Sequence, residues 1–153
     1  LVAFVWFRNR RVDRGVPEPR DVVLPTGFRI GGAILGVLLV TFGAIGFADP
    51  TLMIDRWPWT LTPLTARIIA CYAIEGGLVS LMLSRDSRWT AWRAITGAAV
   101  IGSALLLFGM LRAWGDLETD NALTWLLVIG LSATVVAGTA ALVLFQRLLK
   151  AGR

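Results

Sequence analysis

The chain contains four long apolar stretches separated by short polar segments. Each stretch has about 18 to 24 residues, and an α-helix needs about 20 residues to cross the hydrocarbon core of a bilayer. We therefore predict an all-α integral membrane bundle of four complete transmembrane helices. The predicted spans cover residues of about 30–47, 63–83, 94–111 and 122–145.

Prolines and charged residues mark the segments between the spans. The second span is expected to begin after Thr62, because threonine can cap a helix and Pro63 fits its first turn. Residues 12–29 contain three prolines and charges of both signs without a helical period, which predicts a surface loop. An acidic loop is predicted over 112–121.

The chain opens with seven apolar residues, Leu1–Phe7, followed by a basic run. Seven residues are too few to span a bilayer. We interpret them as the end of a truncated helix that begins further upstream, with a short interfacial anchor as the alternative. The predicted organisation is thus a helix end and cytoplasmic loop over 1–29, and a transmembrane bundle over 30–153.

The basic residues predict an orientation. Twelve of the fifteen Lys and Arg residues lie in the segments 8–29, 84–93 and 146–153, which fall on one side of the predicted bundle. Cytoplasmic loops carry the excess of positive charge. We therefore expect a multi-pass protein of a bacterial plasma (inner) membrane, with membrane lipids around it and its C-terminus in the cytoplasm.

The seven tryptophans are expected to anchor the helices at the two membrane surfaces, because indole favours the headgroup level. None of them falls in the middle of a predicted span. The expected outer anchors are Trp57, Trp59, Trp114 and Trp125, and the expected inner ones are Trp6, Trp89 and Trp92.

Small residues at a spacing of four predict close helix packing, since membrane helices associate through tight contacts more than through hydrophobic burial. The alternative is that Gly and Ala are simply frequent in such helices. The predicted packing residues are Gly32, Gly36, Ala98, Gly102, Gly130, Thr134 and Gly138. On the other face of the last span, Leu127, Leu131 and Leu142 are expected to contact lipid.

One ionisable residue, Glu75, lies deep in a predicted span. It follows the helix start at Pro63 by twelve residues, which places it about 18 Å into a core of about 30 Å. A carboxylate exposed to lipid there is costly, so Glu75 is expected to face the bundle or a partner. We weigh a hydrogen bond to Thr96, Ser103 or Thr134 against a proton, cation or substrate site and against a bond to another subunit.

Arg67 shares a helix face with Glu75, with Cys71 between them at intervals of four residues. Arg67 and Glu75 are about 12 Å apart along the axis, so they cannot pair directly. Arg67 is expected to reach the outer headgroups or to hold the Trp57–Trp59 loop through a cation–π contact. Cys71 is expected to be a small buried apolar residue.

The composition excludes most catalytic chemistry. Histidine is absent, which removes the commonest zinc ligand and general base, and the single cysteine excludes an intrachain disulfide. The net charge of +5 is spread over the ends of the spans, which does not favour a nucleic-acid partner. We predict no cofactor, no metal site and no enzymatic activity.

The segment from Trp57 to Arg67, with the sequence WPWTLTPLTAR, resembles a loop and helix start found in uncharacterised polytopic membrane proteins of actinobacteria and Chloroflexota-type bacteria. The resemblance covers eleven residues and implies no activity.

These observations favour a non-catalytic membrane subunit or scaffold of a larger bacterial assembly, such as an energy-transducing complex, with other membrane subunits as partners. A small transporter or channel component that uses Glu75 is the first alternative. A lipid- or quinone-acting membrane enzyme is the second.

Overall fold

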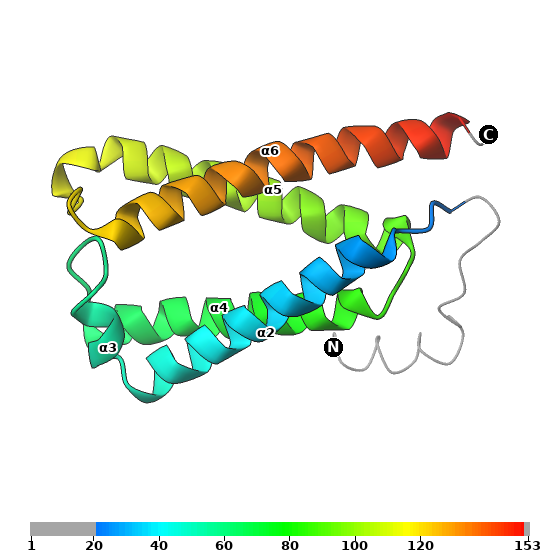
Figure 1. Ribbon diagram of the computed structural model, residues 1–153. Helices are drawn as coiled ribbons and strands as arrows, with labels where there is room; N and C mark the ends of the chain where they lie inside the picture. Colours follow the sequence, from blue (N-terminus) through cyan, green and yellow to red (C-terminus); the bar gives the residue numbers. More distant parts are fainter. Residues whose placement is uncertain (1–20, 152–153) are drawn as a thin grey trace, which may run out of the picture.

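A computed structural model of the protein describes residues 21–151 and confirms the all-α fold (Figure 1). The predicted helix end at Leu1–Phe7 and most of the following loop, with Trp6, lie outside the described residues. The elements in chain order are α2 (Thr26–Ala48), α3 (Thr51–Ile54), α4 (Pro63–Ser84), α5 (Trp89–Arg112), a 3-10 turn (Trp114–Asp116) and α6 (Ala122–Ala151).

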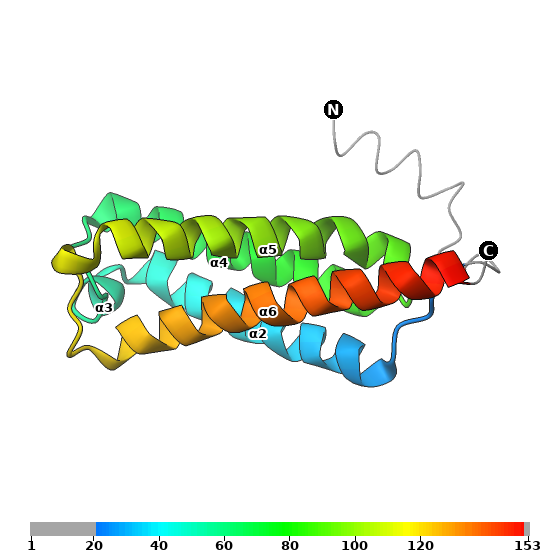
Figure 2. The same ribbon diagram turned by 90° about the horizontal axis from the view of Figure 1, so that it is seen from above.

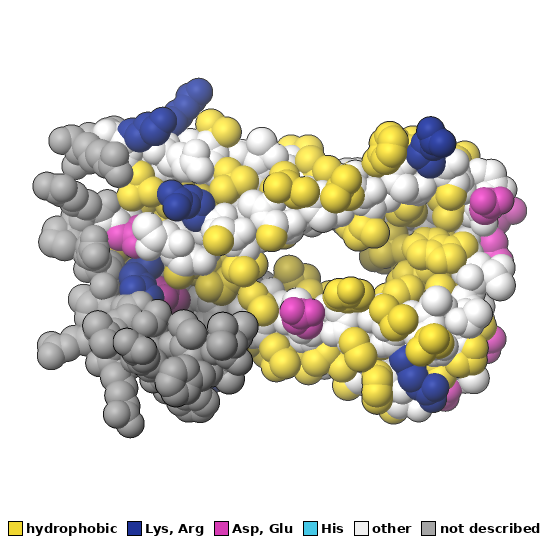
Figure 3. All heavy atoms as spheres, turned by 180° about the vertical axis from the view of Figure 1, so that it is seen from behind, with side chains coloured by type: hydrophobic (Ala, Val, Ile, Leu, Met, Phe, Trp, Pro, Cys, Tyr) yellow, Lys and Arg dark blue, Asp and Glu magenta, His cyan; other side chains and the backbone are white. Residues whose placement is uncertain are grey.

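The four long helices α2, α4, α5 and α6 are each long and apolar enough to cross a membrane. They run along one common axis, as Figures 1 and 2 show. In the space-filling view, most charged side chains gather toward the two ends of the molecule, one acidic side chain lies midway along it, and apolar side chains cover much of the length between the ends (Figure 3). The protein is therefore a multi-pass membrane protein.

Three helices are longer than the apolar stretches predicted. Helix α2 begins at Thr26 instead of about residue 30, α5 begins at Trp89 instead of 94, and α6 continues to Ala151 instead of 145. The apolar stretch marks only the part of a helix that lipid tails surround. The helix itself continues through the headgroup level, where Arg and Lys can reach water.

The predicted start of α4 is confirmed in detail. The Thr62 hydroxyl accepts a hydrogen bond from the Thr65 backbone N–H at 3.2 Å, and the Thr65 hydroxyl accepts one from the Thr62 N–H at 2.8 Å. This reciprocal arrangement is a capping box, and Pro63 occupies the first helical position.

The long helices form two antiparallel hairpins, one of α2 with α4 and one of α5 with α6. Glycines bring α2 and α4 close together. A Cβ atom added to Gly36 would lie 2.9 Å from the Gly77 carbonyl oxygen, and one added to Gly43 would lie 2.5 Å from that of Ala70. No side chain larger than hydrogen fits at these crossings.

The predicted packing residues differ in their surroundings. Gly32 faces the Trp92 ring, Gly36 faces α4, and Gly138 faces Val100 on α5. A Cβ added to Gly102 or Gly130 would meet nothing within 4 Å, and Ala98 and Thr134 are exposed. The close approach seen at Gly36 and Gly138 is therefore not found at Gly102 or Gly130.

The two hairpins meet at their ends. At the outer end, Trp57, Leu61 and neighbouring buried residues pack against Leu123 and Leu127 of α6. At the inner end, Trp89 and Leu24 form a cluster that Leu142 joins. Leu127 and Leu142, which were predicted to contact lipid, are therefore half-buried against these two clusters.

Between these two clusters the hairpins do not pack closely. No helix of one hairpin has an extensive contact with a helix of the other, and Figure 3 shows an opening between them midway along the molecule. The four spans consequently keep most of their side chains exposed at the depth of the hydrocarbon core.

Candidate functional site

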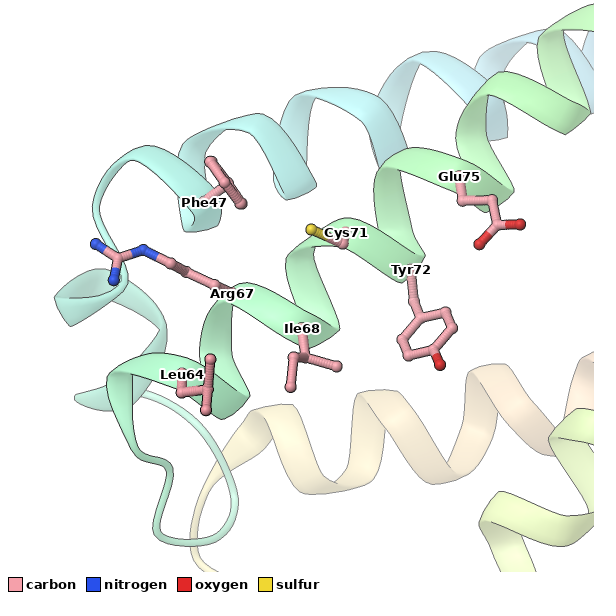
Figure 4. Close-up of a pocket in the computed structure, with 7 residues that line it drawn as sticks. All are labelled: Phe47, Leu64, Arg67, Ile68, Cys71, Tyr72 and Glu75. Atoms are coloured by element: carbon pink, nitrogen blue, oxygen red, sulfur yellow. The ribbon is translucent and has the colours of Figure 1, made fainter.

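An open groove of about 440 Å³ runs along the outer half of α4 (Figure 4). Each of its residues on α4 lies three or four positions from another one, so they share one stripe of the helix. Phe47 of α2 closes one side. The lining is mostly apolar, and the residues are Phe47, Leu64, Arg67, Ile68, Cys71, Tyr72 and Glu75. We call it the Glu75 groove.

Glu75 lies at the deep end of the groove and its side chain is exposed. It is the single acidic residue of the four long helices. No hydrogen bond or ion pair joins it to another residue of the described chain. The Thr134 hydroxyl donates instead to the Gly130 carbonyl oxygen at 2.9 Å, and neither Thr96 nor Ser103 is bonded to Glu75. A bond within the chain, one of the expected arrangements, is therefore absent from residues 21–151.

Arg67 lies at the outer end of the groove, and its guanidinium points away from the Glu75 carboxylate (Figure 4). The expected cation–π contact with the Trp57–Trp59 loop is not formed among the described residues. Those two tryptophan rings instead pack edge to face on each other, with centroids 5.2 Å apart. The Arg67 side chain is exposed, so it can meet a group from outside the chain.

Cys71 and Tyr72 lie in the middle of the groove. The Cys71 thiol is free and exposed, so the prediction that it is buried was wrong. The reason is that Ala66, Ala70 and Gly77 occupy the side of α4 that faces α2, and Cys71 lies more than a quarter of a turn round the helix from Ala70, at the open groove. Tyr72 is 70% exposed and points away from α2 in Figure 4.

The inner tryptophans lie at the predicted helix end but are buried within the protein. Trp89 is 0% exposed, its ring lies 4.7 Å from that of Phe145, and its indole N–H has no partner in the described chain. The Trp92 indole donates to the Asp86 carbonyl oxygen at 3.0 Å. These two residues join α5 to both α2 and α6.

The outer tryptophans differ among themselves. Trp57 is buried in the outer cluster, whereas Trp114 and Trp125 are exposed and pack on each other with ring centroids 6.0 Å apart. The Trp125 indole donates to the Thr119 carbonyl oxygen at 3.0 Å. This pair has the exposure that a headgroup-level anchor needs.

The inner loop between α4 and α5 carries a local ion pair. Arg88 donates to the Asp86 carboxylate, with a closest distance of 2.8 Å. These side-chain hydrogen bonds hold the pKa of Asp86 below its ordinary value, although partial burial opposes them. Arg29 of α2 donates to the Ser84 carbonyl oxygen at 2.9 Å and so covers the C-terminal end of α4.

The outer loops are held together mainly by backbone acceptors. The Glu118 N–H donates to the Pro58 carbonyl oxygen at 2.8 Å, and the Asn121 amide donates to that of Arg56 at 2.9 Å. The Thr124 hydroxyl donates to the Glu118 carbonyl oxygen at 2.6 Å. Within residues 21–151, no three His, Cys, Asp or Glu side chains gather as metal ligands would.

Fold and site together define a multi-pass membrane protein of four apolar helices with an unpaired carboxylate at mid-span in the described chain. Comparison with protein-family models, with curated proteins and with solved structures finds no match to this chain.

Proposed function

We propose that this chain is a non-catalytic integral membrane subunit or scaffold that packs against other membrane proteins in a larger assembly. One observation carries the proposal. Glu75 is exposed near the middle of α4, and no residue of the described chain bonds to it. A partner chain would supply the hydrogen bond or ion pair that the Glu75 carboxylate lacks within the described chain.

The free energy of exposing a carboxylate to lipid supports this proposal. Insertion measurements give about 2.5–3.5 kcal/mol for a charged residue at the centre of a membrane helix, and simulations give more. Intramembrane acids accordingly face the interior of a bundle, a water-filled cavity or an opposite charge. In this chain the carboxylate lies outside the tight α2–α4 contact, and a neighbouring chain that covers it would remove the cost.

The loose packing of the two hairpins gives independent support. They are fastened at both ends by the tryptophan clusters, and they leave each other's middle sections uncovered. Membrane helices gain stability from close van der Waals contact. A subunit whose central faces pack on a partner would gain the contacts that the isolated chain does not make.

We further propose a bacterial plasma membrane and a cytoplasmic C-terminus. The basic residues Arg29, Arg85, Arg88, Arg93, Arg147 and Lys150 belong to the inner ends of the four helices or their connections. The outer ends carry Arg56, Arg67 and Arg112 with several acidic residues. This asymmetry supports the orientation.

Purification from the source membrane in a mild detergent, followed by mass spectrometry, tests the proposal. The expected result is one or more integral membrane proteins at a fixed ratio to this chain. Recovery of the chain alone, or only with copies of itself, would contradict it. A Glu75→Gln flux assay in liposomes would then test the transporter alternative.

The Glu75 groove favours one second candidate, a binding site for a lipid or quinone. The groove joins the headgroup level at Arg67 to mid-membrane depth at Glu75 along an apolar wall. Lipid extraction from the purified protein tests it. A single lipid or quinone species retained at a fixed ratio by the natural chain and lost in an Ile68→Trp variant would support this candidate.

A further inference from the structure

We infer that the Glu75 groove receives a transmembrane helix of a partner protein that carries a Lys or Arg at the depth of Glu75. This inference rests on the proposed subunit function and names the chemistry of the partner. It follows from the charges of Arg67 and Glu75 and from the residues that a second copy of this chain could place beside Glu75.

A second copy of the chain does not meet the requirement. The Lys and Arg residues of the long helices all lie within two turns of a helix end. Copies in one membrane share their orientation, so a second copy would place at this depth apolar residues, hydroxyls such as that of Thr134, which already donates to Gly130, or another Glu75, but no Lys or Arg. A like charge raises the cost of a buried carboxylate instead of lowering it.

A lipid satisfies only one end of the groove. Its phosphate matches Arg67, and an acyl chain matches Ile68 and Phe47. The acyl chain of the lipid would then lie against the Glu75 carboxylate, at the depth where a charged group is most costly in free energy. The polar deep end of the groove therefore favours a protein helix, which can carry a basic side chain at mid-membrane depth.

The spacing of the two charged residues specifies the partner further. Arg67 and Glu75 are eight residues apart on one stripe of α4, or about 12 Å along the axis. A partner helix lying in the groove would place a Lys or Arg opposite Glu75. About two turns closer to the outer surface, it would place an acidic side chain, or a backbone carbonyl at a helix end, opposite Arg67. We expect that pattern in the partner sequence.

Photo-crosslinking from position 72 tests the inference, because the Tyr72 side chain is 70% exposed in the groove and lies one turn from Glu75. The probe is p-benzoylphenylalanine, an aromatic residue of similar shape, placed at this position in the full chain and activated by light in the source membrane. We expect the crosslinks to fall on one partner helix, within about a turn of a Lys or Arg. Crosslinks to lipid only, to a second copy, or to a helix without a base would overturn the inference.

Two charge variants sharpen the test. Glu75→Gln, and replacement of the partner base by Gln, should each lower the crosslink yield by about tenfold, and the two together should lower it little further. Equal yields in all four combinations would show that the charges do not meet. The matched control carries the probe at Val136 of α6, which is 71% exposed, and should not label the basic segment.

The inference and the proposed function can fail separately. If a membrane partner purifies at a fixed ratio while position 72 labels only lipid, the subunit function stands and the Glu75 groove is not its docking site. If no other protein purifies with the chain, both fail.

Discussion

Gly36 on α2 and Gly77 on α4 face each other so closely that a Cβ added to Gly77 would lie 2.7 Å from the Gly36 carbonyl oxygen. The same atom would lie 2.8 Å from the Val40 backbone nitrogen. Backbone atoms cannot move aside as a flexible side chain can. This pair therefore sets the distance between the helices of the first hairpin.

Gly77→Ala should destabilise the protein through this contact. The methyl group would force α2 and α4 apart, at a cost of about 1–3 kcal/mol in free energy of unfolding. The matched control is Gly102→Ala in the interior of α5, where an added Cβ meets nothing within 4 Å. Unfolding in mixed micelles, followed by tryptophan fluorescence, measures both. Equal losses in the two variants would contradict the described crossing.

Trp89→Leu should loosen the inner connection between the hairpins. Trp89 is 0% exposed and packs on Phe145, so its loss should cost about 3 kcal/mol in free energy of unfolding. Trp125→Leu is the comparison, because Trp125 is 48% exposed and should cost about 1 kcal/mol or less. The same micelle unfolding assay measures both variants. A larger loss at Trp125 than at Trp89 would mean that the inner cluster does not hold the hairpins together.

Asp86 should make stability depend on pH in the acidic range. Hydrogen bonds from Arg88 lower the pKa of Asp86 in the folded protein, so the stabilisation is fully present above the unfolded pKa of about 3.9. It is lost as the pH falls through the lower folded pKa. Because the pair is partly exposed, the change should be about 1 kcal/mol or less.

Comparison of the natural chain with Asp86→Asn between neutral pH and pH 3 measures this contribution. Asp86→Asn should lack the part of the stability loss at acidic pH that comes from protonation of Asp86. An identical pH profile for the two chains would show that the Asp86–Arg88 pair does not contribute.

Cysteine labelling in intact cells should report the proposed orientation. In a Cys71→Ser background, a cysteine at Asp120 should react with a membrane-impermeant maleimide, and one at Ser87 should react only after the membrane is opened. Both positions lie in connections outside the long helices. The reverse pattern would place the C-terminus outside the cytoplasm and contradict the proposal.

The sequence predicts those features that depend on local chemistry. The four apolar stretches and the Thr62-Pro63 start of α4 follow from hydrophobic length and capping, and the structure confirms them. The early starts of α2 and α5 are missed, because apolar length marks the lipid core and not the helix end. Trp89 illustrates this, since its helix begins well before the apolar stretch.

The arrangement of the helices could not be predicted in the same way. All faces of these helices are apolar, so hydrophobicity does not tell which face meets a neighbour and which meets lipid. The four-residue spacing singled out Gly102 and Gly130, where an added Cβ would meet nothing within 4 Å, whereas Gly77, which packs against α2, is not part of that pattern. Cys71 was predicted to be buried because hydrophobicity does not tell which side of α4 meets a neighbour. Glu75 was the exception, because its charge indicated that its side of the helix needs a polar partner.

The central claim is that Glu75 holds this chain to a membrane partner, and a paired purification tests it most directly. The natural chain, Glu75→Gln and Val136→Gln are purified from the source membrane under identical mild conditions, and the ratio of partner to chain is measured by mass spectrometry. We predict a fixed ratio for the natural chain and Val136→Gln, and a loss of about tenfold for Glu75→Gln. A ratio that is unchanged by Glu75→Gln would contradict the account.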